Sequence, residues 1–182
     1  DGGDDTDAIS FYDVGAAVNV DLSTSTVTDD GYGNTEAGKI SNIENIIGTL
    51  NYGDSLTGDN NDNVIYGHGG NDTIDGQGGF DTIYGGTGTD KINTGTDTHD
   101  SSEDVVYGGE GVDTITGNFD KAVIFGDIVG GANVEEDWID YSGSTSGITA
   151  DLAQTSLYTL DSANDTLDGN YVQVINNDTP GE

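Results

Sequence analysis

The sequence contains no cysteine, no methionine and no arginine, and it has a single proline in 182 residues. The absence of cysteine excludes disulfide bonds and thiol chemistry. Basic residues number only 3, against 35 acidic ones, so the formal net charge is −32. A chain this acidic repels phosphate backbones and anionic lipid surfaces. Nucleic acid is therefore excluded as a partner.

Apolar residues are also scarce, at 32% of the chain, and there is one tryptophan. No apolar stretch approaches the roughly 18 residues that a membrane-spanning helix needs, so no membrane insertion is expected. The length suits one domain, elongated rather than built around a large core. Some source of stability other than disulfides must offset the charge.

Glycine, in contrast, is abundant, with 30 residues, and it recurs with a period of nine. Four consecutive nonapeptides cover residues 58–93, and another covers residues 108–116. In each, the sixth residue is Asp or Asn and the eighth is aliphatic. With short insertions, this register gives the sixth positions Asp7, Asp54, Asn63, Asp72, Asp81, Asp90, Asp104, Asp113, Ala122 and Asp137. The corresponding eighth positions are all Ile, Leu or Val, which a disordered Gly/Asp linker would not explain.

This period predicts a flat coil made of tight loops and three-residue strands. The glycines at positions one, two and four are expected to supply positive φ in the loop. The eighth residue is expected to point inward, because side chains alternate along a strand. Two units complete one turn, so residues 18 apart should stack. Asp54, Asp72 and Asp90 then form one column, and Asn63 with Asp81 begins the opposite column.

Stacked carboxylates about 4.8 Å apart repel each other unless a cation lies between them. The available donors are carboxylates and loop carbonyls, which suit Ca²⁺. Mg²⁺ prefers strict octahedral geometry and keeps its waters, and a Zn²⁺ site would need more imidazoles than His68 and His99. The pattern therefore indicates several Ca²⁺ ions as cofactors.

The pattern G-G-x-G-x-D-x-U-x, best matched by residues 85–93 and 108–116, resembles the RTX (repeats-in-toxin) calcium-binding nonapeptide. The resemblance implies an all-β fold, a right-handed parallel β-roll with Ca²⁺ held between loops. It also implies secretion through a one-step channel. The metal ligands that it implies are Asp54, Asp72, Asp81, Asp90, Asp104 and Asp113, with weaker candidates Asn63, Asp7 and Asp137, and the loop glycines Gly67, Gly76, Gly85 and Gly108.

A longer period encloses the first, because residues 7–22 reappear as residues 137–152, a shift of 137 − 7 = 130. Alternating apolar residues over 18–22 and 148–152 predict half-buried strands, and residues 40–48 are a further strand candidate. We expect residues 1–10 to end a preceding repeat and residues 11–47 to form a flanking β segment. Residues 48–140 are expected to form the β-roll, with insertions at 94–103 and 126–136, and residues 141–182 to begin a second flanking segment.

Tyrosines at ninth positions predict an aromatic ladder on an outer face. Tyr66 and Tyr84 are 18 residues apart, and Tyr107 and Phe125 occupy the same position. Cross-strand packing explains such a ladder better than a carbohydrate-binding strip does. No nucleophile motif accompanies His68 or His99, so the chain is not expected to be an enzyme.

The sequence thus predicts a non-catalytic calcium-binding module of a secreted bacterial protein, extracellular or at the cell surface. It would fold on binding Ca²⁺ after export and serve as a scaffold or extender in an adhesin, surface layer or self-assembling array. Its partners would be calcium ions and other copies of itself or neighbouring repeats. The alternative is the export and folding module of a secreted RTX hydrolase or toxin whose active domain lies elsewhere.

Overall fold

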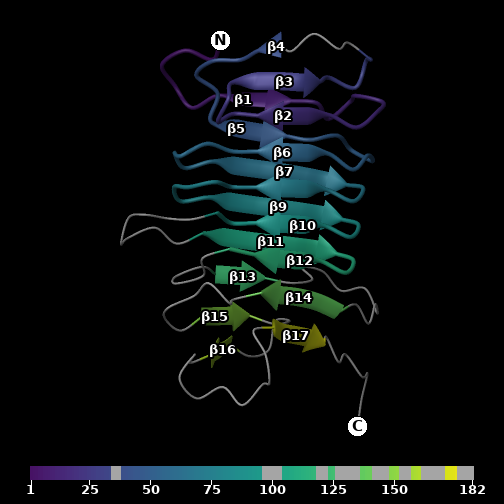
Figure 1. Ribbon diagram of the computed structural model, residues 1–182, viewed down its shortest axis with the longest axis vertical. Helices are drawn as coiled ribbons and strands as arrows, with labels where there is room; N and C mark the ends of the chain where they lie inside the picture. Colours follow the sequence, from purple (N-terminus) through teal and green to yellow (C-terminus); the bar gives the residue numbers. More distant parts are fainter. Residues whose placement is uncertain are drawn as a thin grey trace.

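Two parallel β-sheets face each other and form one coil. The computed structural model describes residues 1–33, 38–95, 104–117, 123–125, 136–140, 148–151, 157–160 and 171–175. Every regular element in these ranges is a strand, so none of them contains a helix that could cross a membrane. Figure 1 shows the strands lying like rungs along the longest axis, with β4 at one end of the stack and β16 and β17 at the other.

The first sheet has eight strands, in the order β1-β5-β7-β9-β11-β13-β15-β16. All neighbours are parallel except β15 and β16. The strands are β1 (Ala8–Ser10), β5 (Asn45–Ile47), β7 (Val64–Gly69), β9 (Thr82–Thr87), β11 (Val105–Glu110), β13 (Val123–Phe125), β15 (Ile148–Asp151) and β16 (Leu157–Leu160).

The second sheet has nine strands, in the order β17-β14-β12-β10-β8-β6-β2-β3-β4. Its middle is parallel, and antiparallel strands close both ends. The strands are β2 (Asn19–Asp21), β3 (Thr26–Asp29), β4 (Gly38–Lys39), β6 (Ser55–Thr57), β8 (Thr73–Asp75), β10 (Lys91–Asn93), β12 (Thr114–Thr116), β14 (Glu136–Asp140) and β17 (Tyr171–Ile175). This alternation of strands between two sheets confirms the predicted parallel β-roll.

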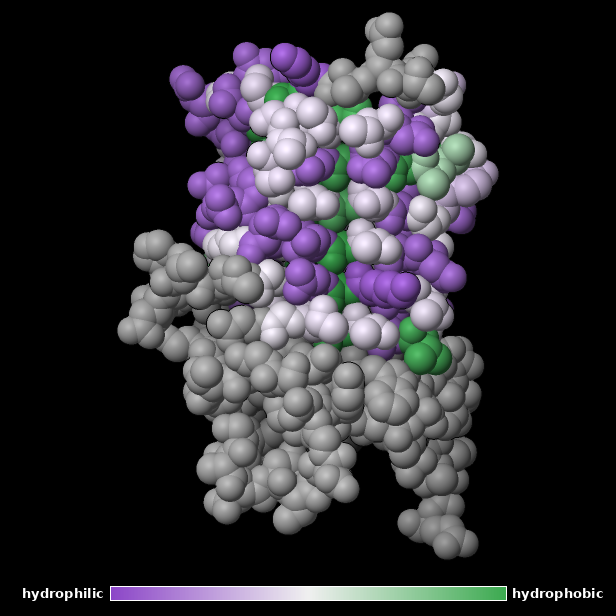
Figure 2. All heavy atoms as spheres, in the orientation of Figure 1, coloured by the Kyte–Doolittle hydropathy of each residue, from purple (hydrophilic) through white to green (hydrophobic). Residues whose placement is uncertain are grey.

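The core is a double column of aliphatic side chains between the sheets. From the nonapeptide of Asp54 to that of Asp113, the eighth residue is at most 1% exposed, and its neighbours in the strand point outward. The residues are Leu56, Ile65, Ile74, Ile83, Ile92, Val106 and Ile115. Figure 2 shows how narrow this apolar material is, with a thin hydrophobic line between broad rows of polar side chains. Such a core buries little apolar surface per residue, so the fold needs another source of stability.

The loops turn through positive φ at the second and fourth positions of the nonapeptide. At position four, Gly70, Gly79, Gly88 and Gly111 all have φ between 112° and 141°. At position two, even His68 and Gln77 adopt φ of 72° and 75°. First-position glycines have no positive φ, so the prediction that they serve the same purpose was wrong.

Strands of the segment before residue 48 continue the same two sheets. Pairing passes from β1 through β5 to β7 and from β2 to β6 without a break, in parallel register. Val18, Val20 and Leu22 are buried, which confirms the predicted alternation. The division into segments at residues 10, 47 and 140 stays a prediction, and most of the two insertions lies outside the described residues.

Candidate metal centre

Buried carboxylates form a column along the second sheet. The strands β6, β8, β10 and β12 of this sheet are each preceded by an Asp at the sixth position. One carboxylate oxygen of each later Asp accepts the backbone N–H of the Asp one turn earlier. Asp54 N–H donates to Asp72 Oδ1 (2.7 Å), Asp72 N–H to Asp90 Oδ1 (2.8 Å) and Asp90 N–H to Asp113 Oδ1 (2.9 Å). These side chains are at most 3% exposed. The column predicted from the 18-residue spacing is confirmed.

A second column lies along the first sheet and has the same geometry. Asn63 N–H donates to Asp81 Oδ1 (2.9 Å), and Asp81 N–H donates to Asp104 Oδ1 (3.0 Å). The last step spans 23 residues because an insertion separates the two turns. Both columns therefore stack through side chain to backbone hydrogen bonds that fix one oxygen of each carboxylate.

The other carboxylate oxygen of the central aspartates has no hydrogen-bond donor. Asp72 Oδ2 and Asp90 Oδ2 are fully buried and accept no hydrogen bond. Leaving a buried anionic oxygen unpaired costs several kcal/mol, so a native fold normally satisfies such a group. An oxygen of this kind is what a cation would satisfy.

First-position glycines keep open the space beside these oxygens. A Cβ on Gly67 would collide with Asp72 Oδ2 and with the carbonyl oxygen of Gly85. A Cβ on Gly85 would lie 2.6 Å from Asp90 Oδ2 and closer still to the carbonyl oxygen of Gly108. The glycine is required for space rather than for backbone conformation. Each cradle therefore brings a carboxylate oxygen close to a carbonyl oxygen of the next turn.

The same pair of groups recurs along both columns. The pairs of side-chain and carbonyl oxygens, each named with the glycine between them, are Asp54 with Gly67 at Gly48, Asn63 with Gly76 at Gly58, Asp72 with Gly85 at Gly67, Asp81 with Thr94 at Gly76, and Asp90 with Gly108 at Gly85. All the donors are hard oxygens, which favours Ca²⁺. The predicted ligand glycines thus place their carbonyls in the cradles, and the donor set fits calcium.

Side chains alone do not make the centre. In the ranges that the structure describes, no three carboxylates or imidazoles gather closely enough to hold a metal ion. Loop carbonyls must therefore complete any coordination sphere, as Ca²⁺ sites with six to eight oxygen ligands allow.

Without a cation, burial disfavours the charged form of the central carboxylates. Desolvation raises the pKa of Asp72 to about 7, and the nearby Asp90 and Asp54 carboxylates raise it too, while the Asp54 N–H lowers it. Desolvation raises the pKa of Asp90 to about 6, against the lowering effect of the Asp72 N–H. The calcium-free fold therefore contains carboxylates that favour protonation near neutral pH.

We expect acid to replace part of the effect of calcium. Because the pKa values of Asp72 and Asp90 in the fold exceed the ordinary aspartate value of 3.8, the folded chain binds more protons than the unfolded chain between about pH 4 and 7. Stability of the calcium-free fold should therefore fall as pH rises through this window and return on acidification. Circular dichroism of protein freed of calcium by dialysis would show β structure increasing from about pH 7.5 to about pH 5. Loss of β signal over that range would contradict the pKa directions.

The sequence pattern did not predict one carboxylate of the column along the first sheet. Glu44 precedes β5 as the aspartates precede their strands, and its Oε2 accepts the N–H of Asp7 (2.8 Å). Its backbone carbonyl accepts a hydrogen bond from Asn63 Nδ2 (2.8 Å). The signal was available, since Glu44 and Ile46 have the spacing of the sixth and eighth positions, but the loop before Glu44 lacks the glycines.

The remaining candidates lie at the two ends of the columns. Asp7 lies beside a cradle at Gly2, whose second oxygen is the carbonyl of Asn42. Thr114 of β12 pairs with Trp138 of β14. Asp113 and Asp137 each precede one of these residues, so Asp137 occupies the position of Asp113 one turn later. Ala122 precedes β13 and lies outside the described residues. At the start of the column along the second sheet, Val18 occupies the position of an aspartate, and its backbone N–H donates to Asp54 Oδ1 (2.9 Å).

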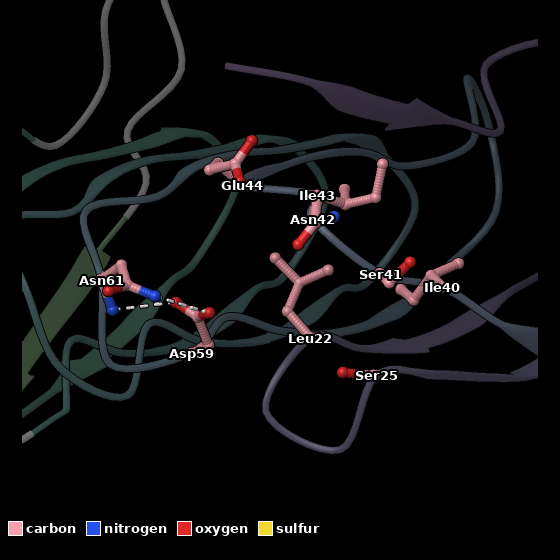
Figure 3. Close-up of a pocket in the computed structure, with 9 residues that line it drawn as sticks. All are labelled: Leu22, Ser25, Ile40, Ser41, Asn42, Ile43, Glu44, Asp59 and Asn61. Atoms are coloured by element: carbon pink, nitrogen blue, oxygen red, sulfur yellow. Dashed lines mark hydrogen bonds between the residues drawn. The ribbon is translucent and has the colours of Figure 1, made fainter. Parts of the chain in front are cut away.

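A hollow of about 170 Å³ opens beside the columns near the N-terminal end. Figure 3 shows Glu44 and Asp59 on its walls, with Asn61 close to Asp59. The Asp59 carboxylate accepts hydrogen bonds from Asn61 N–H (2.8 Å) and Asn61 Nδ2 (2.9 Å), and Glu44 already accepts the Asp7 N–H. The lining has no histidine or lysine to act with these carboxylates. This hollow has no catalytic constellation.

The predicted aromatic ladder is present on the outside of the first sheet. Tyr66 stacks on Tyr84 and Tyr84 on Tyr107, with ring centroids 4.6 and 4.7 Å apart and planes within 2°. His68 continues the stack beside Tyr66, and Tyr12 meets it edge-on. The ring faces cover one another and leave mainly edges for solvent, so this geometry favours cross-strand packing over sugar stacking. His99 lies outside the described residues.

Comparison with known families agrees with this geometry. The sequence pattern of the RTX calcium-binding nonapeptide repeat, in four copies, matches the chain over residues 49–83, 69–98 and 100–127. No curated protein matches the chain. The matched ranges contain both carboxylate columns from Asp54 to Asp113 and four of the five cradle glycines, namely Gly58, Gly67, Gly76 and Gly85. The chain therefore carries RTX calcium-binding nonapeptide repeats between residues 49 and 127, and the family of these repeats binds calcium.

Proposed function

We propose that this chain is a non-catalytic calcium-binding module whose β-roll folds when Ca²⁺ enters the carboxylate columns. The observation that carries the proposal is the pair of buried oxygens, Asp72 Oδ2 and Asp90 Oδ2, without donors and beside loop carbonyls. The Asp side chains at positions 54, 72, 81, 90, 104 and 113 and the carbonyls of the cradle loops would hold the ions. Calcium would supply the positive charge that the chain lacks.

Charge and core size make the metal a condition for folding. With a net charge of −32 and a core of only two aliphatic columns, the chain without metal has little to offset the repulsion among its carboxylates. Each Ca²⁺ neutralises two negative charges, and its binding energy becomes folding energy. Extracellular calcium modules bind at about 10⁻⁴ to 10⁻³ M, so the chain would stay unfolded in a calcium-poor cytoplasm and fold outside. RTX repeats are typical of secreted proteins, which supports this order of events.

The role that fits best is a scaffold or extender in an adhesin, surface layer or self-assembling array. The duplicated segment, residues 7–22 and 137–152, supports this role because it indicates units that follow one another. The second candidate is the export and folding module of a secreted hydrolase or toxin. Calcium-dependent filaments or sheets of the purified chain would favour the first role, and an unrelated globular segment in the parent protein would favour the second.

A calcium titration tests the central proposal. We expect circular dichroism to show a largely disordered chain in chelator and a β-rich chain in millimolar calcium, with a cooperative transition between them. Magnesium at the same concentrations is the control, and it should give little β structure because it keeps its waters. A fully β-structured chain in excess chelator at neutral pH would refute calcium as the folding switch.

A further inference from the structure

One segment of sequence lies at both ends of the roll. Residues 137–152 repeat the pattern of residues 7–22, with identical residues at Asp7 and Asp137, Ile9 and Ile139, Asp21 and Asp151, and Leu22 and Leu152, so that β1 and β2 correspond to β14 and β15. The first copy pairs with strands that follow it, β1 with β5 and β2 with β6. The second copy pairs in parallel with strands that precede it, β14 with β12 and β15 with β13. The same segment therefore both begins a roll and ends one.

In the described chain, the outer edge of β1 has no neighbouring strand. Asp7 C=O accepts the N–H of Asn45, and Phe11 N–H donates to Ile47 C=O, so alternate residues of β1 face β5. The backbone groups of Ala8 and Ser10 therefore point to the open edge. In the second copy, β12 covers the corresponding edge, with Thr114 opposite Trp138 and Thr116 opposite Asp140.

The carboxylate column reaches this open edge. A Cβ on Gly2 would collide with Asp7 Oδ2 and Asn42 O, the same two kinds of group that surround Gly67 inside the roll. Asp7 Oδ2 is buried and has no hydrogen-bond partner, like Asp72 Oδ2. The edge thus has the chemistry of an internal turn rather than that of a finished end.

The neighbouring edge, that of β2, is covered by an antiparallel strand. Antiparallel β3 lies where the second copy has parallel β13 against β15. Its pairing with β2 is irregular between Asn19 and Val20. Val27 is the buried side chain of β3, and Thr28 and Asp29 are exposed. Little apolar contact therefore holds β3 in this place.

We propose that residues 7–29 form a junction between two rolls. The open edge of β1 accepts the last turn of a preceding roll of the same type, in the register that β12 and β14 show. β3 leaves the edge of β2 to admit the strand equivalent to β13, so the two rolls continue as one rod. The occupant is a preceding roll in the same polypeptide, because the internal copy shows that connection already made. This inference rests on the proposed calcium-dependent roll.

A tandem chain tests the junction. In it, residues 1–136 are followed by residues 7–182, so that Asp7 of the second unit follows residue 136 as Asp137 does in the single chain. The sequence has no cysteine, so Thr116→Cys in the first unit and Ser10→Cys in the second report one contact. The matched control is the single chain with Thr116→Cys and Asp140→Cys, which are partners in register. Neighbouring parallel strands are about 4.8 Å apart, within the Cα range of a disulfide.

In calcium, we expect the junction pair to oxidise within the chain at a rate within about threefold of the control pair. Adding Ala8→Pro to the second unit removes an outward N–H without touching the bonds to β5, so it should abolish this cross-link. Circular dichroism of the single chain carrying Ala8→Pro shows that the roll still folds.

A junction pair that oxidises at least about tenfold more slowly than a working control pair would overturn the junction and leave the calcium-bound roll intact. Cross-links between two polypeptides would also overturn it and assign the edge to a second copy. Failure of the control pair would remove the β12–β14 pairing on which the inference rests. Failure of the proposed function is distinguished by the single chain, which would then show no calcium-dependent β structure.

Discussion

Asp72→Asn should weaken the calcium-bound roll and at the same time strengthen the calcium-free one. Asparagine keeps an oxygen to accept the Asp54 N–H, so the buried backbone hydrogen bond at 2.7 Å survives. It replaces the oxygen beside Gly67 and Gly85 with an amide NH₂ group, which cannot coordinate a cation. In calcium the cradle loses its charged ligand. Without calcium the chain loses a carboxylate whose charged form is disfavoured, since burial raises the pKa of Asp72 to about 7.

One calcium titration measures both effects, the weaker calcium-bound roll and the stronger calcium-free roll. Calcium affinity depends on the number of charged ligands, so we expect the folding midpoint of Asp72→Asn to rise by about tenfold or more. In calcium-free buffer at neutral pH its β signal should equal or exceed that of the natural chain, because burying a neutral amide costs less than burying an anion. A lower β signal in calcium-free buffer would show that the carboxylate stabilises the fold by itself.

Asp62→Asn is the matched control. The carboxylate of Asp62 also accepts a backbone N–H 18 residues later, that of Phe80 at 2.8 Å, but the side chain is exposed and lines no cradle. Asp62→Asn removes one negative charge, as Asp72→Asn does. Its calcium midpoint should change by less than about twofold, as for an exposed and screened charge. Equal shifts for the two variants would mean that net charge, rather than a site at Asp72, controls the midpoint.

The nine-residue register predicted the strands and the inward side chains because both follow from local alternation. Ile65, Ile74 and Ile83 are buried as the eighth position requires. Glu44 was missed because its loop carries no glycine pattern. Its place in the column is set by the pairing of β5 with β1 and β7, a contact between distant segments.

The glycines also show that the local sequence pattern does not predict contacts between distant segments. Positive φ at the second and fourth positions is a local property, and the sequence predicted it. At the first position, the need for glycine comes from a carbonyl one turn away, such as that of Gly108 beside Gly85. His68 shows the converse, because it adopts positive φ without glycine while its ring packs between Tyr12 and Tyr66. Tertiary contacts determine both the need for glycine at the first position and the positive φ of His68. The nine residues of one repeat do not contain the partners in these contacts.

Gly85→Ala should raise the calcium requirement of the roll without straining the backbone. Its Cβ would lie 2.6 Å from Asp90 Oδ2, 3.2 Å from Ile92 Cδ1, and closer still to Gly108 O. Gly85 has no positive φ, so the effect is steric and not a backbone strain. Forcing a methyl group into a packed site costs about 1–3 kcal/mol, and here the group also takes the space between the two oxygens that would hold a cation. We therefore expect the calcium midpoint to rise by about tenfold or more, together with a lower melting temperature in calcium.

Gly15→Ala is the control for this substitution. A Cβ at Gly15 meets no atom within 4 Å, and its φ is not positive. Its free energy of unfolding should change by less than about 0.5 kcal/mol and its calcium midpoint should stay within about twofold. Both variants add the same methyl group, so their difference measures the cradle alone. A natural calcium midpoint for Gly85→Ala would show that the ion does not occupy the space that this glycine leaves open.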